Sequence, residues 1–334
     1  VEKDKHAKYL EFIFNIFSPT PYIIKKYSSD NMRQAIEKIL ADEKIELMHC
    51  DSLQMSYNLD KINVPRKVLT EHNIESQIWQ RYAQNQTNPL AKILLWLQYK
   101  KLSTYEFSPC NKFNRCVTVS DIDAQILIKN GVSAEITVVP NGVDTEYFRD
   151  SPTRFARGQS LVFTGSLDWL PNEDALVYFF ANIYGIIKKR APGTQITIVG
   201  RNPSQKLKDF ADKDPSIRLV GRVDDVRPYV QKSEVFVVPL RIGGGTRLKI
   251  LEAMAMGVPI VSTSIGAEGI EVTDGKNIIL ADTPEEFASK ILELFGNVSR
   301  KQEIANEARK LVEEKYDWLP ISKKLEVAWN SAIL

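Results

Sequence analysis

The chain has 334 residues, more than one ordinary hydrophobic core organises, so we expect two domains. Hydrophobic residues make up 43% and charged residues 26%, as is usual for soluble globular proteins. The formal net charge of +2 gives no overall attraction for nucleic acid, so we expect no nucleic-acid partner and only local anion sites. Three cysteines, without disulfide or metal-site spacing, favour a reducing, cytoplasmic environment.

No apolar run reaches the ~18 residues that a membrane-spanning helix needs. Residues 92–101 combine lysines with apolar side chains, and such a segment could touch the anionic inner face of the cell membrane. The simpler alternative is an ordinary domain helix whose lysines lie in water.

The first half alternates short apolar runs with helical periods, which indicates α/β structure with parallel strands. We assign residues 1–150 to this domain. A nucleotide-binding sheet usually opens with a strand and a glycine-rich turn, whereas this chain opens with a charged, aromatic segment. We therefore expect the N-terminal domain to lack its first βα units. The expected elements are a helix at 29–42, a helical region at 74–105 broken at Pro89, and strands at 45–50, 66–70, 116–120 and 136–139.

The second half, assigned to residues 151–315, follows a polar stretch at 150–159 that suits an interdomain linker. Its pattern predicts a complete doubly wound domain. The expected strands are 161–164, 195–199, 217–220, 234–239, 259–262 and 277–280, and the expected helices are 172–190, 246–256, 285–295, 301–315 and 320–332.

The strongest chemical signal is a glycine-rich loop between a buried strand and a helix. Gly243, Gly244 and Gly245 allow backbone N–H groups to approach an anion, and the helix that opens at Thr246 adds free donors and a positive dipole end. A flexible surface turn is the alternative, and glycines alone would be weak support for an anion site. The strand, the glycines, the basic residues and an in-helix glutamate together favour a phosphate site.

Charged residues follow this loop at informative spacings. Arg247 and Lys249 lie two apart, so a regular helix points them in different directions, and Arg247 must lie in the loop or the first turn if both bind one diphosphate. Lys249 and Glu252 share a helix face, with Leu248 between the two basic residues. Glu252 is ~7.5 Å along the helix from Arg247, which suits a carboxylate binding ribose hydroxyls, although a solvated glutamate is the alternative.

This segment resembles the donor-binding signature of the glycosyltransferases called group 1 or family 4, and its Gly-Gly-Thr-Arg-Leu-Lys-Ile-Leu-Glu-Ala-Met-Ala form is similar to a subset of them. The family pattern has two glutamates eight residues apart. The second matches Glu252, whereas the first falls on Gly244 and is absent. The resemblance implies the GT-B fold, with two Rossmann-like domains facing across a cleft, and a retaining transfer.

The resemblance extends to other donor-side positions. Residues 162–167, with Gly165 and Ser166, and Pro171-Asn172 look like the opening of the donor domain. Family members often carry an Arg and a Lys after this strand, where this chain has Asp168, so we infer that Arg247 and Lys249 take over as catalytic charges. Backbone groups near Arg222 and Val223 are implied to contact the nucleotide base. Residues 307–318 resemble helices that return to the first domain, and 316–334 is assigned to that crossing.

His72 is the candidate catalytic residue of the first domain. Residues 71–73 resemble the family's histidine that touches the donor sugar, and an imidazole at a strand end can hydrogen-bond a hydroxyl. The alternative is a structural cap for the next helix, shared with Asn73. Asp121 and Asp123 could suggest a metal, but Asp121 is better explained as a helix cap, so we expect no metal.

The resemblance implies an enzyme that moves a sugar from a nucleotide-diphospho-sugar, its substrate and not a cofactor, to a sugar or lipid-linked acceptor. Polysaccharide or glycolipid synthesis is the implied setting. Two alternatives remain: a non-catalytic nucleotide-sugar-binding subunit, which the absent first glutamate favours, and a GT-B nucleotide-sugar epimerase.

Overall fold

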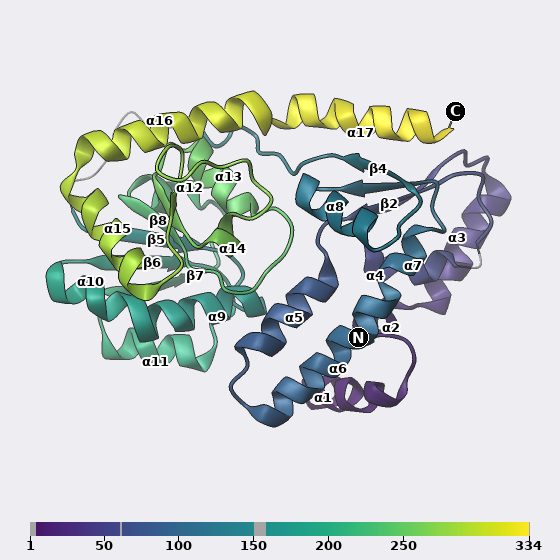
Figure 1. Ribbon diagram of the computed structural model, residues 1–334, viewed down its shortest axis with the longest axis horizontal. Helices are drawn as coiled ribbons and strands as arrows, with labels where there is room; N and C mark the ends of the chain where they lie inside the picture. The colour runs from purple at the N-terminus through teal and green to yellow at the C-terminus, as the bar shows by residue number, and fades with distance from the viewer. Residues whose placement is uncertain (1–4, 61, 150–157, 334) are drawn as a thin grey trace. The chain divides into compact units, whose positions relative to one another are not determined.

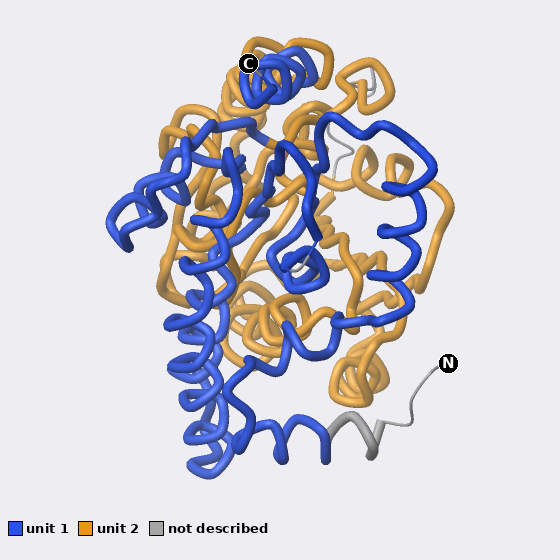
Figure 2. Tube along the Cα trace, turned by 90° about the vertical axis from the view of Figure 1, so that its right-hand side faces the viewer, with its two compact units in different colours: residues 1–140, 322–334 blue, residues 141–321 orange. Residues whose placement is uncertain are grey.

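The structure is a computed structural model that describes residues 5–60, 62–149 and 158–333. The chain divides into two compact units (Figure 2): residues 1–140 with 322–334 form unit 1, and residues 141–321 form unit 2. Most of the predicted linker, residues 150–157, lies outside the described residues. In the described part of the chain, no helix combines the length and the apolar character that crossing a membrane requires.

Unit 1 contains a parallel sheet with strand order β1-β2-β3-β4 (Figure 1). Its strands are β1 Met48–Cys50, β2 Lys67–Glu71, β3 Arg115–Thr118 and β4 Glu135–Val138. The helices before β3 are α1 Lys5–Phe14, α2 Tyr22–Tyr27, α3 Asp30–Asp42, α4 Leu53–Ser56, α5 Glu75–Asn85, α6 Pro89–Tyr105 and α7 Phe107–Cys110, with 3₁₀ turns η1 Asn15–Phe17 and η2 Tyr57–Leu59. Helix α8 Asp121–Lys129 follows β3. Helix α17 Trp318–Ile333 begins in unit 2 and belongs to unit 1 from Ser322 onward.

Local sequence explains where these helices begin. The predicted break at Pro89 is confirmed: the Asn88 side chain accepts hydrogen bonds from the N–H groups of Leu90 and Ala91, and proline needs no donor at the first helical position. The prediction that Asp121 caps α8 is wrong. Ser120 is the cap, because its hydroxyl accepts from the Asp123 N–H, and Asp121 lies in the first turn.

Unit 2 contains a six-stranded parallel sheet with the order β10-β9-β8-β5-β6-β7. The strands are β5 Ser160–Thr164, β6 Gln195–Val199, β7 Ile217–Gly221, β8 Val235–Val238, β9 Ile260–Ser262 and β10 Ile279–Leu280. The direction in which successive strands are added to the sheet reverses between β5 and β8. This position is the topological switch point, where doubly wound sheets bind ligands. Together, the two parallel sheets confirm the predicted α/β class.

Helices cover both faces of this sheet (Figure 1). They are α9 Leu170–Tyr178, α10 Gly185–Arg190, α11 Gln205–Lys213, α12 Arg227–Gln231, α13 Leu248–Ala255, α14 Ser264–Ala267, α15 Pro284–Gly296 and α16 Val298–Lys315. A π-helical turn, η3 Phe179–Tyr184, joins α9 to α10 within the region predicted as one helix. Phe163 packs in one apolar cluster and the neighbouring Val162 in another, so β5 is buried on both sides.

Candidate functional site

The glycine-rich loop lies at the switch point of the unit 2 sheet. Strands β5 and β8 are parallel neighbours, with Leu161 opposite Val235 and Val162 opposite Phe236. Their carboxyl ends therefore meet at one edge of the sheet, where the loop after β5 and the loop between β8 and α13 begin. The topology brings the predicted residues 165–166 and 243–249 to the same edge.

Arg241 anchors the start of the second loop to α9. Its guanidinium makes two parallel hydrogen bonds to the Asp174 carboxylate, at 2.6 and 3.1 Å, and lies 4.4 Å from the centre of the Tyr178 ring. Paired hydrogen bonds of this kind fix both position and orientation. The ion pair between Arg241 and Asp174 thus holds the base of the loop against α9.

Arg247 shapes the tip of the loop. It precedes α13 in an extended conformation, with φ −90° and ψ 98°, so it lies outside the helix, which is the position expected if Arg247 and Lys249 bind one diphosphate. Its guanidinium donates to the carbonyl oxygens of Gly244 and Gly245, and at 3.1 Å to that of Ile265. A Cβ on Gly243, whose φ is +157°, would collide with this guanidinium. Arg247 therefore contacts the loop's own carbonyls, a role that its sequence position alone did not indicate.

Lys249 is the basic group at the first turn of α13. Its ammonium donates a 2.8 Å hydrogen bond to the Asn172 amide oxygen and lies 4.0 Å from the centre of the Phe163 ring. Burial and, to a smaller extent, the positive charge of Arg247 lower the pKa of Lys249 to about 7, although the Glu252 carboxylate acts in the opposite direction. A lysine with a pKa near 7 beside this glycine loop is suited to receive an anion, and a bound anion would raise that pKa again.

Asn172 joins the two loops. Its side-chain N–H group donates to the Ser166 carbonyl at 2.9 Å, while its oxygen accepts from Lys249. Gly165 has φ +145°, and a Cβ there would lie 2.7 Å from the Lys249 nitrogen and 2.8 Å from the Asn172 nitrogen. The sequence placed Asn172 in a family-like segment but gave it no role. Its position directly after Pro171, at the start of a helix, was the available signal.

The remaining donor-side candidates are less closely connected. Glu252 is partly buried one turn along α13, and burial raises its pKa while Lys249 lowers it. Arg222 and Val223 directly follow β7, whose last residue, Gly221, accepts a 2.9 Å hydrogen bond from the Gly200 N–H. These two residues therefore lie at the carboxyl edge of the same sheet. Of the other loop positions, Thr246 is partly buried and Leu248 is exposed.

In unit 1, His72 follows β2 and is paired with Asp51, which follows β1. The ring Nε2 lies 3.1 Å from the Asp51 carboxylate, and both side chains are partly or largely exposed. The pairing follows from the sheet, because β1 and β2 are adjacent and parallel, with Cys50 opposite Leu69. Asp51 was missed from the sequence, although it too ends a predicted strand. Asn73 does not cap α5, because the cap position is Ile74.

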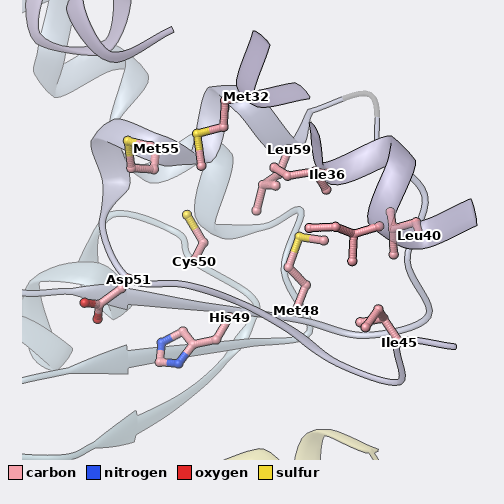
Figure 3. A pocket seen from close by; sticks show the side chains of 11 residues that line it. Met32, Ile36, Leu40, Ile45, Met48, His49, Cys50, Asp51, Met55 and Leu59 are labelled. Atoms are coloured by element: carbon pink, nitrogen blue, oxygen red, sulfur yellow. The ribbon is translucent and has the colours of Figure 1, made fainter. Parts of the chain in front are cut away.

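An apolar pocket lies beside this pair (Figure 3). It follows β1 and is bounded by α3 and the segment from α4 to η2, with Asp51 at its rim. Most of its lining is aliphatic or sulfur-containing, including Met32, Ile36 and Met48. None of the predicted donor-binding residues lines it. Among the described residues, no group of three or more His, Cys, Asp or Glu side chains is arranged to hold a metal.

Two family profiles match the chain. "Glycosyltransferase Family 4" matches residues 6–147 and "Glycosyl transferases group 1" matches residues 158–297. The chain belongs to the group 1, or family 4, glycosyltransferases.

Similar solved structures share the GT-B fold. Sucrose-phosphate synthase from Thermosynechococcus elongatus has a TM-score of 0.73 at 15% identity, over 90% of this chain and 77% of that one. A mutant of S. aureus TarM in complex with Fondaparinux, alpha-GlcNAc-glycerol and UDP has a TM-score of 0.71 at 18% identity. The match covers 89% of this chain and 58% of that one.

Curated relatives match over shorter stretches. An "Uncharacterized 44.6 kDa protein in cps region" of Klebsiella pneumoniae is 28% identical over 165 residues, which is 47% of this chain and 42% of the relative. A phosphatidyl-myo-inositol mannosyltransferase of Mycolicibacterium smegmatis is 24% identical over 217 residues, 63% of this chain and 55% of the relative. The chain thus spans about half the length of the curated relatives that it matches.

Proposed function

We propose that this chain transfers a sugar from a nucleotide-diphospho-sugar to an acceptor hydroxyl with retention of configuration. The bond from the anomeric carbon to the diphosphate breaks, and a bond to the acceptor oxygen forms on the same face. The acceptor proton passes to the departing diphosphate. The observation that carries the proposal is the Lys249 ammonium, held beside Gly165 and Asn172 at the switch point of the unit 2 sheet.

The diphosphate is the part of the donor that this edge suits best. Backbone N–H groups of Gly243, Gly244 and Gly245, the start of α13 and the Lys249 ammonium all favour negative charge. Arg247 adds positive charge while its hydrogen bonds hold the loop carbonyls away from the anion. We assign Lys249 the direct contact with the leaving group and Arg247 the shaping of the loop. Preorganised charge of this kind stabilises a transition state without a metal.

The other donor contacts follow from their places on the same edge. Glu252, one turn along α13, is assigned to the ribose hydroxyls, since a carboxylate there can accept two hydrogen bonds. Backbone groups of Arg222 and Val223, after β7, are assigned to the base, and Gly165 and Ser166 to the diphosphate and sugar. Because Gly244 stands where the family pattern has its first glutamate, the sugar must be recognised by other groups.

His72 is the proposed unit 1 contact with the transferred sugar. Asp51 orients the His72 ring through its contact with Nε2, and an imidazole held in this way can exchange a hydrogen bond with a sugar hydroxyl. The acceptor is proposed to be a sugar or a lipid-linked sugar, in polysaccharide or glycolipid synthesis, because one relative acts on phosphatidyl-myo-inositol and another is encoded in a cps region.

A thermal-shift panel of UDP, GDP, ADP and their sugars tests donor binding, since a ligand stabilises the fold by RT ln(1 + [L]/Kd). We expect one nucleotide series to raise the melting temperature, and Lys249→Met to remove that shift. Lys290→Met is the matched control, because Lys290 forms only an exposed pair with Glu293. Product formation with the selected donor then separates a transferase from a binding subunit, and interconversion of the donor sugar without an acceptor would indicate an epimerase.

A further inference from the structure

The edge of the unit 2 sheet assigned to the diphosphate offers little free positive charge. Burial lowers the pKa of Lys249 to about 7, so a large share of the molecules carry a neutral lysine at neutral pH. The Arg247 guanidinium already donates to the carbonyl oxygens of Gly244 and Gly245. Because a diphosphate carries more than one negative charge, a further cation at this edge would strengthen its binding.

Arg201 is a cation at the end of the strand next to β5. It follows β6, which is the parallel neighbour of β5 in the sheet. Its side chain is 56% exposed, and its Nε lies 3.6 Å from the Asp168 carboxylate in the loop after β5. Since the carboxyl ends of parallel strands meet at one edge, Arg201 lies at the same edge as Gly165.

The backbone around Arg201 is fixed against the loop after β5. The Arg201 carbonyl accepts a 3.0 Å hydrogen bond from the Leu167 N–H. A Cβ on Gly200 would lie 1.9 Å from the Gly165 carbonyl oxygen, so only glycine allows the two loops to approach this closely. In the part of the chain that the structure describes, Asn202 is the one non-glycine residue with a positive φ, 54°. The Arg201 side chain therefore begins beside the loop assigned to the diphosphate.

Asp168 is bound more closely by Asn202 than by Arg201. The Asn202 side-chain nitrogen donates a 2.9 Å hydrogen bond to one carboxylate oxygen, whereas Arg201 lies 3.6 Å from the other. The Asn202 hydrogen bond and, to a smaller extent, the Arg201 charge lower the pKa of Asp168, so the carboxylate stays ionised at neutral pH. An exposed ion pair of this length contributes little to stability. The guanidinium can therefore exchange Asp168 for a stronger anion at small cost.

We propose that Arg201 leaves Asp168 and binds the diphosphate of the donor, so that Asp168 is a positioning residue that competes with the donor for the guanidinium. This inference rests on the proposed function and adds Arg201 to Lys249 as a direct contact of the leaving group. Arginine suits this role, because its planar guanidinium stays charged and can make paired hydrogen bonds to phosphate oxygens. Arg222 is the weaker candidate, because it follows β7, which lies one strand further from β5.

Titration calorimetry with UDP, GDP and ADP tests this contact. Arg201→Met should weaken binding of the preferred diphosphate by about tenfold, since it removes a charge-assisted contact. Arg201→Lys should lose less, because lysine keeps the charge but not the paired geometry. Asp168→Asn should tighten binding by about threefold, because the amide oxygen still accepts from Asn202 but no longer competes for Arg201. Variants at the two members of the pair should therefore change the affinity in opposite directions.

Arg190→Met is the matched control, with the same loss of charge. Arg190 is exposed and ends α10 just before β6 begins, so it lies at the opposite, amino-terminal edge of the sheet. Its affinity for the diphosphate should equal that of the wild type. The order of affinities for UDP, GDP and ADP should also stay the same in Arg201→Met, because a contact with phosphate does not read the base.

The opposite signs separate this role from a structural one, because a pair that only held the two loops together would give weaker binding in both variants. Weaker binding by Asp168→Asn, or wild-type affinity in Arg201→Met, would overturn the proposal. If Lys249→Met still lost binding in that case, the donor site would stand without Arg201. A changed order of the three nucleotides in Arg201→Met would assign Arg201 to the base and also overturn it. No binding of any nucleotide by the wild type would refute this inference together with the proposed function.

Discussion

The Lys249 ammonium and the Asn172 amide oxygen form a 2.8 Å hydrogen bond that joins α13 to α9 across the switch point of the unit 2 sheet. The side-chain nitrogen of Asn172 also donates to the Ser166 carbonyl, so the same residue holds both Lys249 and the loop after β5. A neutral amide can hold an ammonium without cancelling its charge. The charged form of the lysine therefore remains able to attract an incoming anion.

Replacing Lys249 with methionine should separate stability from function. Burying the ammonium lowers its pKa to about 7, which means that the folded protein without ligand disfavours the charge. Lys249→Met should therefore raise the melting temperature of the ligand-free protein by a few degrees, while donor turnover falls by ~100-fold or more. Differential scanning fluorimetry and initial-rate assays measure the two effects. A variant with unchanged turnover would remove Lys249 from the site.

Asn172→Ala should weaken donor binding by about tenfold, because Lys249 loses the acceptor that orients it and the Ser166 carbonyl loses its donor. Titration calorimetry with the selected nucleotide measures the change. Asn182→Ala is the matched control, since that amide bonds only the Tyr178 carbonyl on an exposed part of η3. Equal affinities of the two variants would show that Asn172 serves the fold alone.

Gly165→Ala should destabilise unit 2 by ~1–3 kcal/mol, since alanine rarely adopts φ +145° and its Cβ would crowd Lys249 and Asn172. Gly185→Ala provides the contrast: its Cβ would meet nothing within 4 Å, and Gly185 opens α10 with helical angles, φ −60° and ψ −33°. That change should be neutral or stabilising by up to ~1 kcal/mol. Urea unfolding of both variants makes the comparison, and similar losses would argue against crowding at Gly165.

The pH dependence of donor binding should report on Lys249. Its pKa in the free protein is about 7, and a bound diphosphate favours the charged form. Affinity for a nucleotide sugar should therefore be highest below pH 7 and fall as pH rises from 7 to 9, with proton uptake on binding in that window. The ligand-free protein should gain stability over the same range, because the unfolded lysine still binds its proton. Calorimetry in buffers of different ionisation enthalpy measures the uptake, which Lys249→Met should abolish.

Asp51→Asn should lower turnover less than His72→Ala does. The carboxylate only orients the His72 ring, through the 3.1 Å contact, whereas His72 is proposed to touch the sugar. We expect losses of about tenfold and about 100-fold, as is usual for a positioning group and for a direct one. Steady-state kinetics with the selected donor decides the order. If His72→Ala kept the wild-type turnover, His72 would not contact the sugar and its role would be structural.

Structural features that depend on a few neighbouring residues could be predicted from the sequence. The glycine run, the break at Pro89 and the alternation of strands and helices each follow from backbone preferences over a few residues. Asn172 and Asp51 were missed as site residues because their roles depend on which strand ends lie side by side. Asp121 was wrongly preferred over Ser120, although serine is an equally good cap one residue earlier.

The most direct test of the donor site is a crystal structure of the protein with a bound nucleoside diphosphate. We expect phosphate oxygens within hydrogen-bond distance of the Lys249 ammonium and of backbone N–H groups in residues 243–248, with the ribose hydroxyls at Glu252. A pyrophosphate bound away from this edge of the sheet, with Lys249 still bonded only to Asn172, would contradict it.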